Sequence, residues 1–93
     1  MAFIITCTDK PNSRDLRAAT RPDHLAYASE FIDKILVAGP TLDDEGQPNG
    51  SVLIMKFDDR AEAEAFCAGD PYAKAGLFAS TTIMPWRQTI PKE

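Results

Sequence analysis

The sequence predicts an α+β fold in which four antiparallel strands are covered by two helices on one face. Two observations predict it. Strand-like segments occupy residues 2–8, 36–40, 50–57 and 78–88, and helical patterns separate the first from the second and the third from the fourth. With 93 residues, the chain has room for one hydrophobic core. We therefore expect a single domain spanning residues 1–93.

The first strand and the first helix follow from local patterns. Residues 2–8 (AFIITCT) are rich in β-branched residues and alternate as a half-buried strand does. Residues 9–20 are polar and contain KPNS, which predicts a loop. Because proline suits the first helical position, we expect the helix to begin near Pro22 and to run to about Ile35.

The three remaining strands differ in character. Residues 36–40 (LVAGP) form a short strand that ends at a Gly-Pro pair. Residues 50–57 (GSVLIMKF) are the most apolar segment, which indicates a central strand that is apolar on both faces. Residues 78–88 (FASTTIMPWRQ) contain Pro85 near their end, and a proline in a strand favours an edge position.

The second helix is predicted over residues 58–69 (DDRAEAEAFCAG). Asp59 fits the N-cap position, and Glu62 three residues later completes a variant of the capping box. Gly69 is expected to end this helix. Asp70 then caps a single extra turn in which Pro71 takes the first position.

The element order β-α-β-β-α-β is that of the ferredoxin-like fold, which leaves one face of the sheet bare. We expect that face to carry Ile4, Val52, Ile54 and Ile83. An apolar sheet face that is exposed to water is unfavourable, so we expect a partner to cover it. The sequence therefore predicts a homodimer in which two sheets pack face to face into an α+β barrel.

The composition argues against several classes of function. A net charge of −4 disfavours nucleic-acid binding, which depends on clustered Lys and Arg that neutralise phosphates. No apolar run approaches the roughly 20 residues of a membrane span. Strand-like alternation begins directly after Met1 and lacks the features of a signal peptide. We expect a cytoplasmic protein with no nucleic-acid or membrane partner.

The cysteines and the single histidine argue against a metal. Cys7 and Cys67 have neither CxxC nor zinc-type spacing, and each lies among apolar neighbours, which is typical of buried, reduced thiols. With one histidine in the chain, a metal site would need mostly carboxylates, and none cluster suitably. We expect no metal and no other cofactor.

That histidine, His24, lies within an apolar arc of the predicted first helix. It shares one side of the helix with Leu25, Ala28 and Phe31, so it is expected to face the sheet. A histidine in such an arc is more often a structural residue than a catalytic acid or base. The residues alone leave both roles open.

Asp70 also has two interpretations. Capping is the role that the local sequence favours. However, a carboxylate can cap a helix with one oxygen and orient an imidazole with the other. The two crossover units of the fold could bring Asp70 and His24 towards the same edge of the sheet, which makes a His-Asp pair the alternative.

Five motifs in order, RPDHLAY, AGP, GSVLI, DPYAKAGL and MPWR, resemble the YciI-like (YCII-related) family from the first strand to Arg87. The resemblance implies a ferredoxin-like protomer in a dimeric α+β barrel. It also implies an active-site dyad, whose histidine and aspartate match His24 and Asp70. Some members of that family resemble cofactor-free enzymes of aromatic degradation, including dehydrochlorination.

The resemblance also suggests residues that bind a substrate, each with a plainer alternative. Ser51 would donate a hydrogen bond to the substrate, or it closes the preceding Asn-Gly turn. Tyr72 and Trp86 would line the pocket, or they are packing residues. Arg21 would lie at a positive rim that attracts a small anionic molecule, or it belongs to a solvated basic stretch with Lys10, Arg14 and Arg17.

Two hypotheses for the function remain. The first is a cofactor-independent acid–base enzyme, a lyase or isomerase, that acts on a small cyclic or aromatic metabolite through His24 and Asp70. The second is a non-catalytic, dimeric small-ligand-binding or accessory domain in which the same two residues hold the fold together. A polar pair on an apolar face favours the enzyme, and the lack of a third clear catalytic group favours the alternative.

Overall fold

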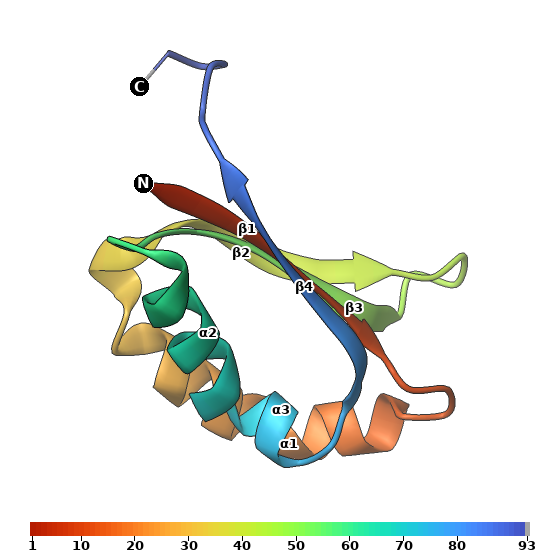
Figure 1. Ribbon diagram of the computed structural model, residues 1–93. Coiled ribbons are helices and arrows are strands. Elements are labelled where there is room, and N and C mark those ends of the chain that lie inside the picture. The colour runs from red at the N-terminus through yellow and green to blue at the C-terminus, as the bar shows by residue number, and fades with distance from the viewer. Residues whose placement is uncertain (93) are drawn as a thin grey trace.

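The computed structural model describes residues 1–92 and has the expected α+β ferredoxin-like architecture (Figure 1). The elements are β1 (Ala2–Asp9), α1 (Arg14–Ser29), the 3-10 turn η1 (Ile32–Lys34), β2 (Ile35–Leu42), β3 (Pro48–Lys56), α2 (Arg60–Gly69), α3 (Pro71–Lys74) and β4 (Phe78–Trp86). All strand pairs are antiparallel in the order β2-β3-β1-β4, so the predicted central and edge positions of β3 and β4 are confirmed.

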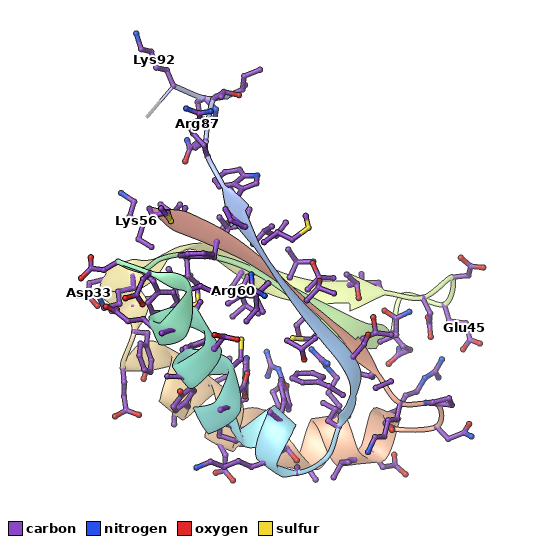
Figure 2. All side chains as sticks on the ribbon, in the orientation of Figure 1. Asp33, Glu45, Lys56, Arg60, Arg87 and Lys92 are labelled. Atoms are coloured by element: carbon purple, nitrogen blue, oxygen red, sulfur yellow. The ribbon has the colours of Figure 1, made fainter. Side chains whose placement is uncertain are left out.

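The helices cover one face of the sheet (Figure 1), and the side chains of the hydrophobic core lie between the two layers (Figure 2). Phe3, Ile5 and Cys7 alternate along β1 and are buried against the helices, as the strand pattern predicts. Leu53 and Met55 do the same on β3. None of the helices within residues 1–92 is long and apolar enough to cross a membrane.

The first helix differs from the prediction at both ends. It begins at Arg14, and Pro22 lies inside it. A proline within a helix costs about 3 kcal/mol, but residues 14–21 are mainly Arg, Leu and Ala, which favour helix, and the side chain of Arg17 is buried under the sheet. At the other end α1 stops at Ser29, six residues before Ile35, which instead begins β2.

The bare face of the sheet is apolar, as predicted, but one of its expected residues lies on the other side. Ile83 is paired with Ile5, and directly opposed residues share a face, so Ile83 packs against the core. The register of β4 instead places Met84 opposite Ile4 on the outer face, with 59% of its surface exposed. Val37, opposite Ile54, also lies on that face and is largely exposed.

The second helix begins and ends as the sequence indicates. Asp59 caps it by accepting a hydrogen bond of 3.0 Å from the backbone N–H of Glu62. At its other end, a Cβ on Gly69 would lie 2.5 Å from the hydroxyl of Tyr27, so a larger residue in this place would force Tyr27 to shift. The same hydroxyl donates to the carbonyl of Phe66 and joins α1 to α2. This contact fixes the position of the residue that follows, Asp70.

Replacing the cap of α2 tests whether this helix is held at its start by the carboxylate oxygen. Asp59→Ala removes the acceptor and is expected to lower the free energy of unfolding by about 1 kcal/mol. Asp59→Asn keeps an acceptor in the same place and should stay within a few tenths of the wild type. Urea unfolding curves measure both. Equal losses in the two variants would contradict the hydrogen-bond explanation, because the charge would then be responsible.

Candidate active site

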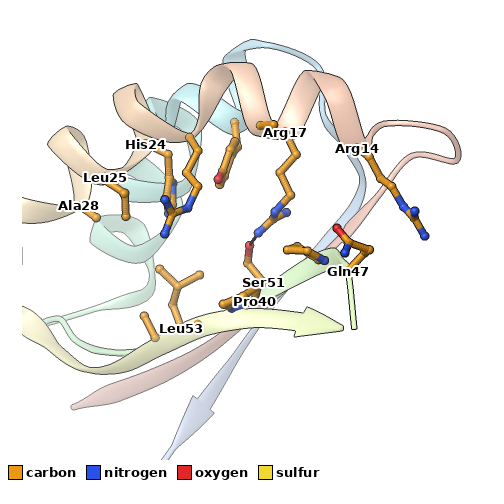
Figure 3. A pocket seen from close by; sticks show the side chains of 15 residues that line it. Arg14, Arg17, His24, Leu25, Ala28, Pro40, Gln47, Ser51 and Leu53 are labelled. Atoms are coloured by element: carbon orange, nitrogen blue, oxygen red, sulfur yellow. Dashed lines mark hydrogen bonds between the residues drawn. The ribbon is translucent and has the colours of Figure 1, made fainter. Parts of the chain in front are cut away.

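A cavity of about 390 Å³ lies between α1 and the strands β2 and β3. Figure 3 shows side chains that reach from the helix and from the strands towards this space; those labelled are Arg14, Arg17, His24, Leu25, Ala28, Pro40, Gln47, Ser51 and Leu53. The arginines, His24 and Ser51 make one part of the wall polar, while Leu25, Ala28 and Leu53 make another part apolar. A cavity of this size and mixed lining is typical of small-molecule sites.

His24 and Asp70 form a hydrogen-bonded pair at this cavity. The Nδ1 atom of His24 lies 2.9 Å from Oδ1 of Asp70, and the two side chains are 14% and 5% exposed. An ionised carboxylate only accepts, so Nδ1 carries a proton and Nε2 is the acceptor of the neutral ring. Nε2 has no hydrogen-bond partner among residues 1–92, and the ring lines the cavity.

Asp70 performs both roles that the sequence left open, but it does so with a single oxygen. Besides the imidazole, Oδ1 accepts a hydrogen bond of 2.9 Å from the backbone N–H of Tyr72 and thereby caps α3. The expectation that one carboxylate oxygen caps the helix while the other orients the imidazole is therefore wrong. The orientation of His24 is tied directly to the start of α3.

The ring of Tyr72 lies between two functional groups of the site. His24 stacks on it with centroids 4.1 Å apart and an interplanar angle of 18°. The guanidinium carbon of Arg17 lies 4.7 Å from the same centroid. Because the stacked imidazole covers one face of the ring, the guanidinium takes the other. Tyr72 therefore spaces His24 and Arg17 by the thickness of an aromatic ring and holds both in orientation.

The hydroxyl of Tyr72 is available to a ligand. It makes no hydrogen bond to another of residues 1–92, and Tyr72, although only 2% exposed overall, lines the cavity. Burial raises the pKa of the Tyr72 phenol, while the charges of Arg17 and Arg21 lower it in part. The net increase keeps the phenol protonated at neutral pH, where it can donate a hydrogen bond.

Arg17 is a central residue of the site that the sequence-based prediction missed. Its Nη1 atom donates to both carboxylate oxygens of Asp9, at 2.8 and 2.9 Å. Its Nη2 atom donates to Oγ of Ser51 at 2.6 Å (Figure 3). The side chains of Arg17 and Asp9 are 9% and 6% exposed. Arg17 is therefore half of a buried ion pair, not a member of a solvated basic stretch.

The other two arginines of α1 differ in their pairing. Arg14 lies 2.7 Å from the carboxylate of Asp43, in the turn between β2 and β3. Arg21 lines the cavity and forms no ion pair or hydrogen bond with residues 1–92. Of the three arginines at the cavity, Arg21 is thus the one whose charge the described residues leave uncompensated.

The two cysteines are poor nucleophiles in this environment. Burial raises the pKa of the Cys7 thiol, which also accepts a hydrogen bond from Thr81. Burial likewise raises the pKa of Cys67 to about 12. Neither forms a disulfide within the described part of the chain. Both thiols are protonated at neutral pH and are therefore weak nucleophiles.

Trp86 does not belong to this cavity. It pairs with Ala2 at the far end of β1, whereas Ser51 pairs with Cys7. Trp86 instead lines a separate surface hollow with Met1 and Pro85. Of the predicted site residues, the structure brings His24, Asp70, Ser51, Arg21 and Tyr72 together and leaves Trp86 apart. No group of three or more His, Cys, Asp or Glu within residues 1–92 is arranged to hold a metal ion.

A sequence signal for Arg17 existed but depended on the helix boundary. Arg14, Arg17, Arg21 and His24 follow one another at intervals of three or four residues, which is the spacing of one helix face. Once α1 is extended back to Arg14, the three arginines fall on the side of His24. No comparable signal marks Asp9, whose position depends on the irregular register between Thr8 and Asp9 in the β1–β4 pair.

Comparison with known proteins agrees with the fold. Residues 1–87 match the model of the YCII-related domain. An uncharacterised protein of Haemophilus influenzae is 32% identical, and the protein YciI of Escherichia coli is 31% identical, each over 97% of this chain and 100% of its own length.

A solved structure is similar over the whole of both chains. It is the 5-chloro-2-hydroxyhydroquinone dehydrochlorinase of Burkholderia phenoliruptrix AC1100, in complex with 2,5-dihydroxybenzoquinone. Its sequence is 37% identical, the TM-score is 0.91, and 100% of each chain is covered. With the family model matching nearly its full length, the chain belongs to the YCII-related family.

Proposed function

We propose that this protein is a cofactor-independent acid–base enzyme of the lyase or isomerase type that acts on a small cyclic or aromatic compound. The observation that carries the proposal is the His24–Asp70 hydrogen bond, which holds the imidazole at a cavity and leaves Nε2 without a protein partner. The proposed chemistry consists of proton transfer and requires no metal or redox group. A positioned base or acid of this kind contributes on the order of 10²–10⁴ in rate.

His24 is the proposed proton-transferring residue. Nε2 takes a proton from an O–H or C–H group of the substrate, and the electron pair of that bond moves into the conjugated ring system to form an oxyanion. Return of the proton to a different atom gives an isomer, and departure of a leaving group with its electron pair gives an elimination product. Asp70 stabilises the imidazolium that forms between the two steps.

The polar wall is suited to a ring that carries oxygen atoms. Ser51 and the hydroxyl of Tyr72 are proposed to hydrogen-bond the oxygens, and Arg21 to attract a substrate with negative charge. The apolar residues Leu25 and Leu53 would contact the hydrocarbon part of the ring. The ligand of the similar dehydrochlorinase, 2,5-dihydroxybenzoquinone, is a compound of this class.

A homodimer that forms through the outer face of the sheet is part of the proposal. The face carries Ile4, Val37, Val52, Ile54 and Met84, and the last residue is 59% exposed. An apolar surface of several neighbouring strands is unfavourable in water. A second copy of the chain would cover it with the same residues across a two-fold axis.

Replacing the proposed base separates function from fold. His24→Gln keeps much of the size of the side chain but cannot transfer protons at neutral pH. We expect a melting temperature within a few degrees of the wild type and a loss of about 10²–10⁴ in turnover. Turnover is measured by NMR, as the exchange of solvent deuterium into cyclic enols and hydroxylated ring compounds. A variant that retains full turnover would remove His24 from the mechanism.

Asp70→Asn tests the charge of the dyad without removing the cap. Because Oδ1 alone accepts both hydrogen bonds, an asparagine oxygen in the same place can accept both again. We expect near-normal stability with strongly reduced turnover, whereas Asp70→Ala should lose turnover and about 1 kcal/mol of stability. Thermal melts and the same exchange assay measure this. If both His24→Gln and Asp70→Asn are destabilised by about 1–3 kcal/mol, the non-catalytic binding domain becomes the better hypothesis.

Light scattering tests the dimer. The wild type at micromolar concentration should have twice the chain mass of 10.2 kDa. Met84→Glu places a charge in the proposed interface and is expected to yield the monomer. Ile32→Glu makes the same kind of change at a residue that is 71% exposed on η1 and should remain dimeric. A monomeric wild type would contradict the barrel.

A further inference from the structure

A second polar chain, Asp9–Arg17–Ser51, reaches the cavity from the side opposite to the dyad across the Tyr72 ring. Asp9 ends β1, where the β1–β4 register shifts, and its side chain is almost completely buried. Both of its oxygens accept from Nη1 of Arg17. Burying these two charges is costly, so their retention beside a candidate active site suggests a functional reason.

The bond between Arg17 and Ser51 has a defined direction. A guanidinium carries donors only, so in the 2.6 Å contact Nη2 donates and Oγ of Ser51 accepts. The single hydroxyl proton of Ser51 must therefore point elsewhere. No residue among 1–92 accepts it, and Ser51 lines the cavity. The hydroxyl is left as a donor directed into the ligand space.

The guanidinium that imposes this direction is fixed on three sides. Asp9 holds one nitrogen, Ser51 occupies another, and the face of the group lies against Tyr72. Asp9 itself is not among the residues that line the cavity. Asp9 therefore makes no direct contact with a ligand in the cavity and influences the hydrogen bonds there through Arg17, which makes Asp9 a positioning residue.

We infer that Asp9 and Arg17 set Ser51 as a dedicated hydrogen-bond donor to a carbonyl or oxyanion oxygen of the ligand. The inference rests on the proposed function, in which the cavity binds a ring that carries oxygen atoms. It narrows the substrate class to conjugated cyclic ketones, hydroxyquinones and their enolates. Such a donor is already aimed before the ligand arrives, so it stabilises negative charge without reorganisation.

A double-mutant cycle tests the inference, with 2,5-dihydroxybenzoquinone as the probe and isothermal titration calorimetry as the measurement. Ser51→Ala removes the donor, and Asp9→Asn removes the charge that holds Arg17. Each is expected to weaken binding by about tenfold. Because Asp9 acts through Ser51, Asp9→Asn should cause no further loss in the Ser51→Ala background. Losses that multiply would assign Asp9 a merely structural role and overturn the inference.

Asp15→Asn is the matched control. It makes the same change of charge in the first turn of α1, at an exposed residue outside the network. It should bind the probe as the wild type does. An equal loss in this control would attribute the effect of Asp9→Asn to net charge and would also overturn the inference.

A second measurement covers the case in which Asp9→Asn does not fold, because it leaves Arg17 buried without a counter-charge. Asp9→Asn combined with Arg17→Gln removes both charges. A hydrogen bond to a carbonyl lowers its stretching frequency, so the infrared band of the bound probe reports the Ser51 donor. We expect a lowered band in the wild type that is lost in Ser51→Ala and in the charge-free pair. An unchanged band in the folded pair variant would overturn the inference.

The outcomes separate the inference from the proposed function. Binding that survives both Ser51→Ala and Asp9→Asn overturns the inference and leaves proton transfer by His24 standing. Binding that depends on Ser51 and Asp9, in a protein whose His24→Gln variant keeps full turnover, supports the inference and overturns the proposed function. A wild type that does not bind the probe overturns the inference.

Discussion

One carboxylate oxygen, Oδ1 of Asp70, joins the parts of the structure that form the candidate site. Asp70 lies between α2 and α3, and its oxygen accepts from the backbone of α3 and from an imidazole on α1. The backbone geometry of the junction therefore determines where the imidazole points. Gly69, which lets Tyr27 approach, fixes the junction itself against α1. The same oxygen therefore caps α3 and orients His24, the proposed base.

The site lies where the hydrophobic core ends. Along β1 the buried residues Phe3, Ile5 and Cys7 are followed by the buried charge of Asp9. An ion pair in this place stabilises the fold less than apolar side chains of the same volume can. In this region the stacked rings of His24 and Tyr72 pack against each other, in place of the apolar side chains that fill the core. The fold is therefore less stable than an apolar core would make it, but its polar side chains are held in fixed orientations, which is typical of functional sites.

Most of the fold could be predicted because it depends on local patterns, whereas the pairing of His24 with Asp70 was predicted from the resemblance of ordered motifs to a known family. The strand alternation, the caps at Asp59 and Asp70, and the place of β3 in the sheet's centre are local or compositional features. The predicted start of α1 was wrong because Pro22 favours the first position of a helix. The preceding residues from Arg14 onward nevertheless continue the helix, and Arg17 among them is buried.

The remaining features depend on contacts between distant segments. Ile83 was assigned to the wrong face because a one-residue change of strand register exchanges the two faces of a sheet. Asp9 and Arg17 meet only when the end of β1 lies beside α1, and nothing in the sequence of either segment indicates this pairing.

The position of Trp86 in the sheet has a practical consequence. It is the only tryptophan and lies five residues along β1 from the level of Ser51, which is about 17 Å. Trp86 therefore makes no direct contact with a ligand in the cavity, and the environment of its indole reports on what covers the far end of the sheet.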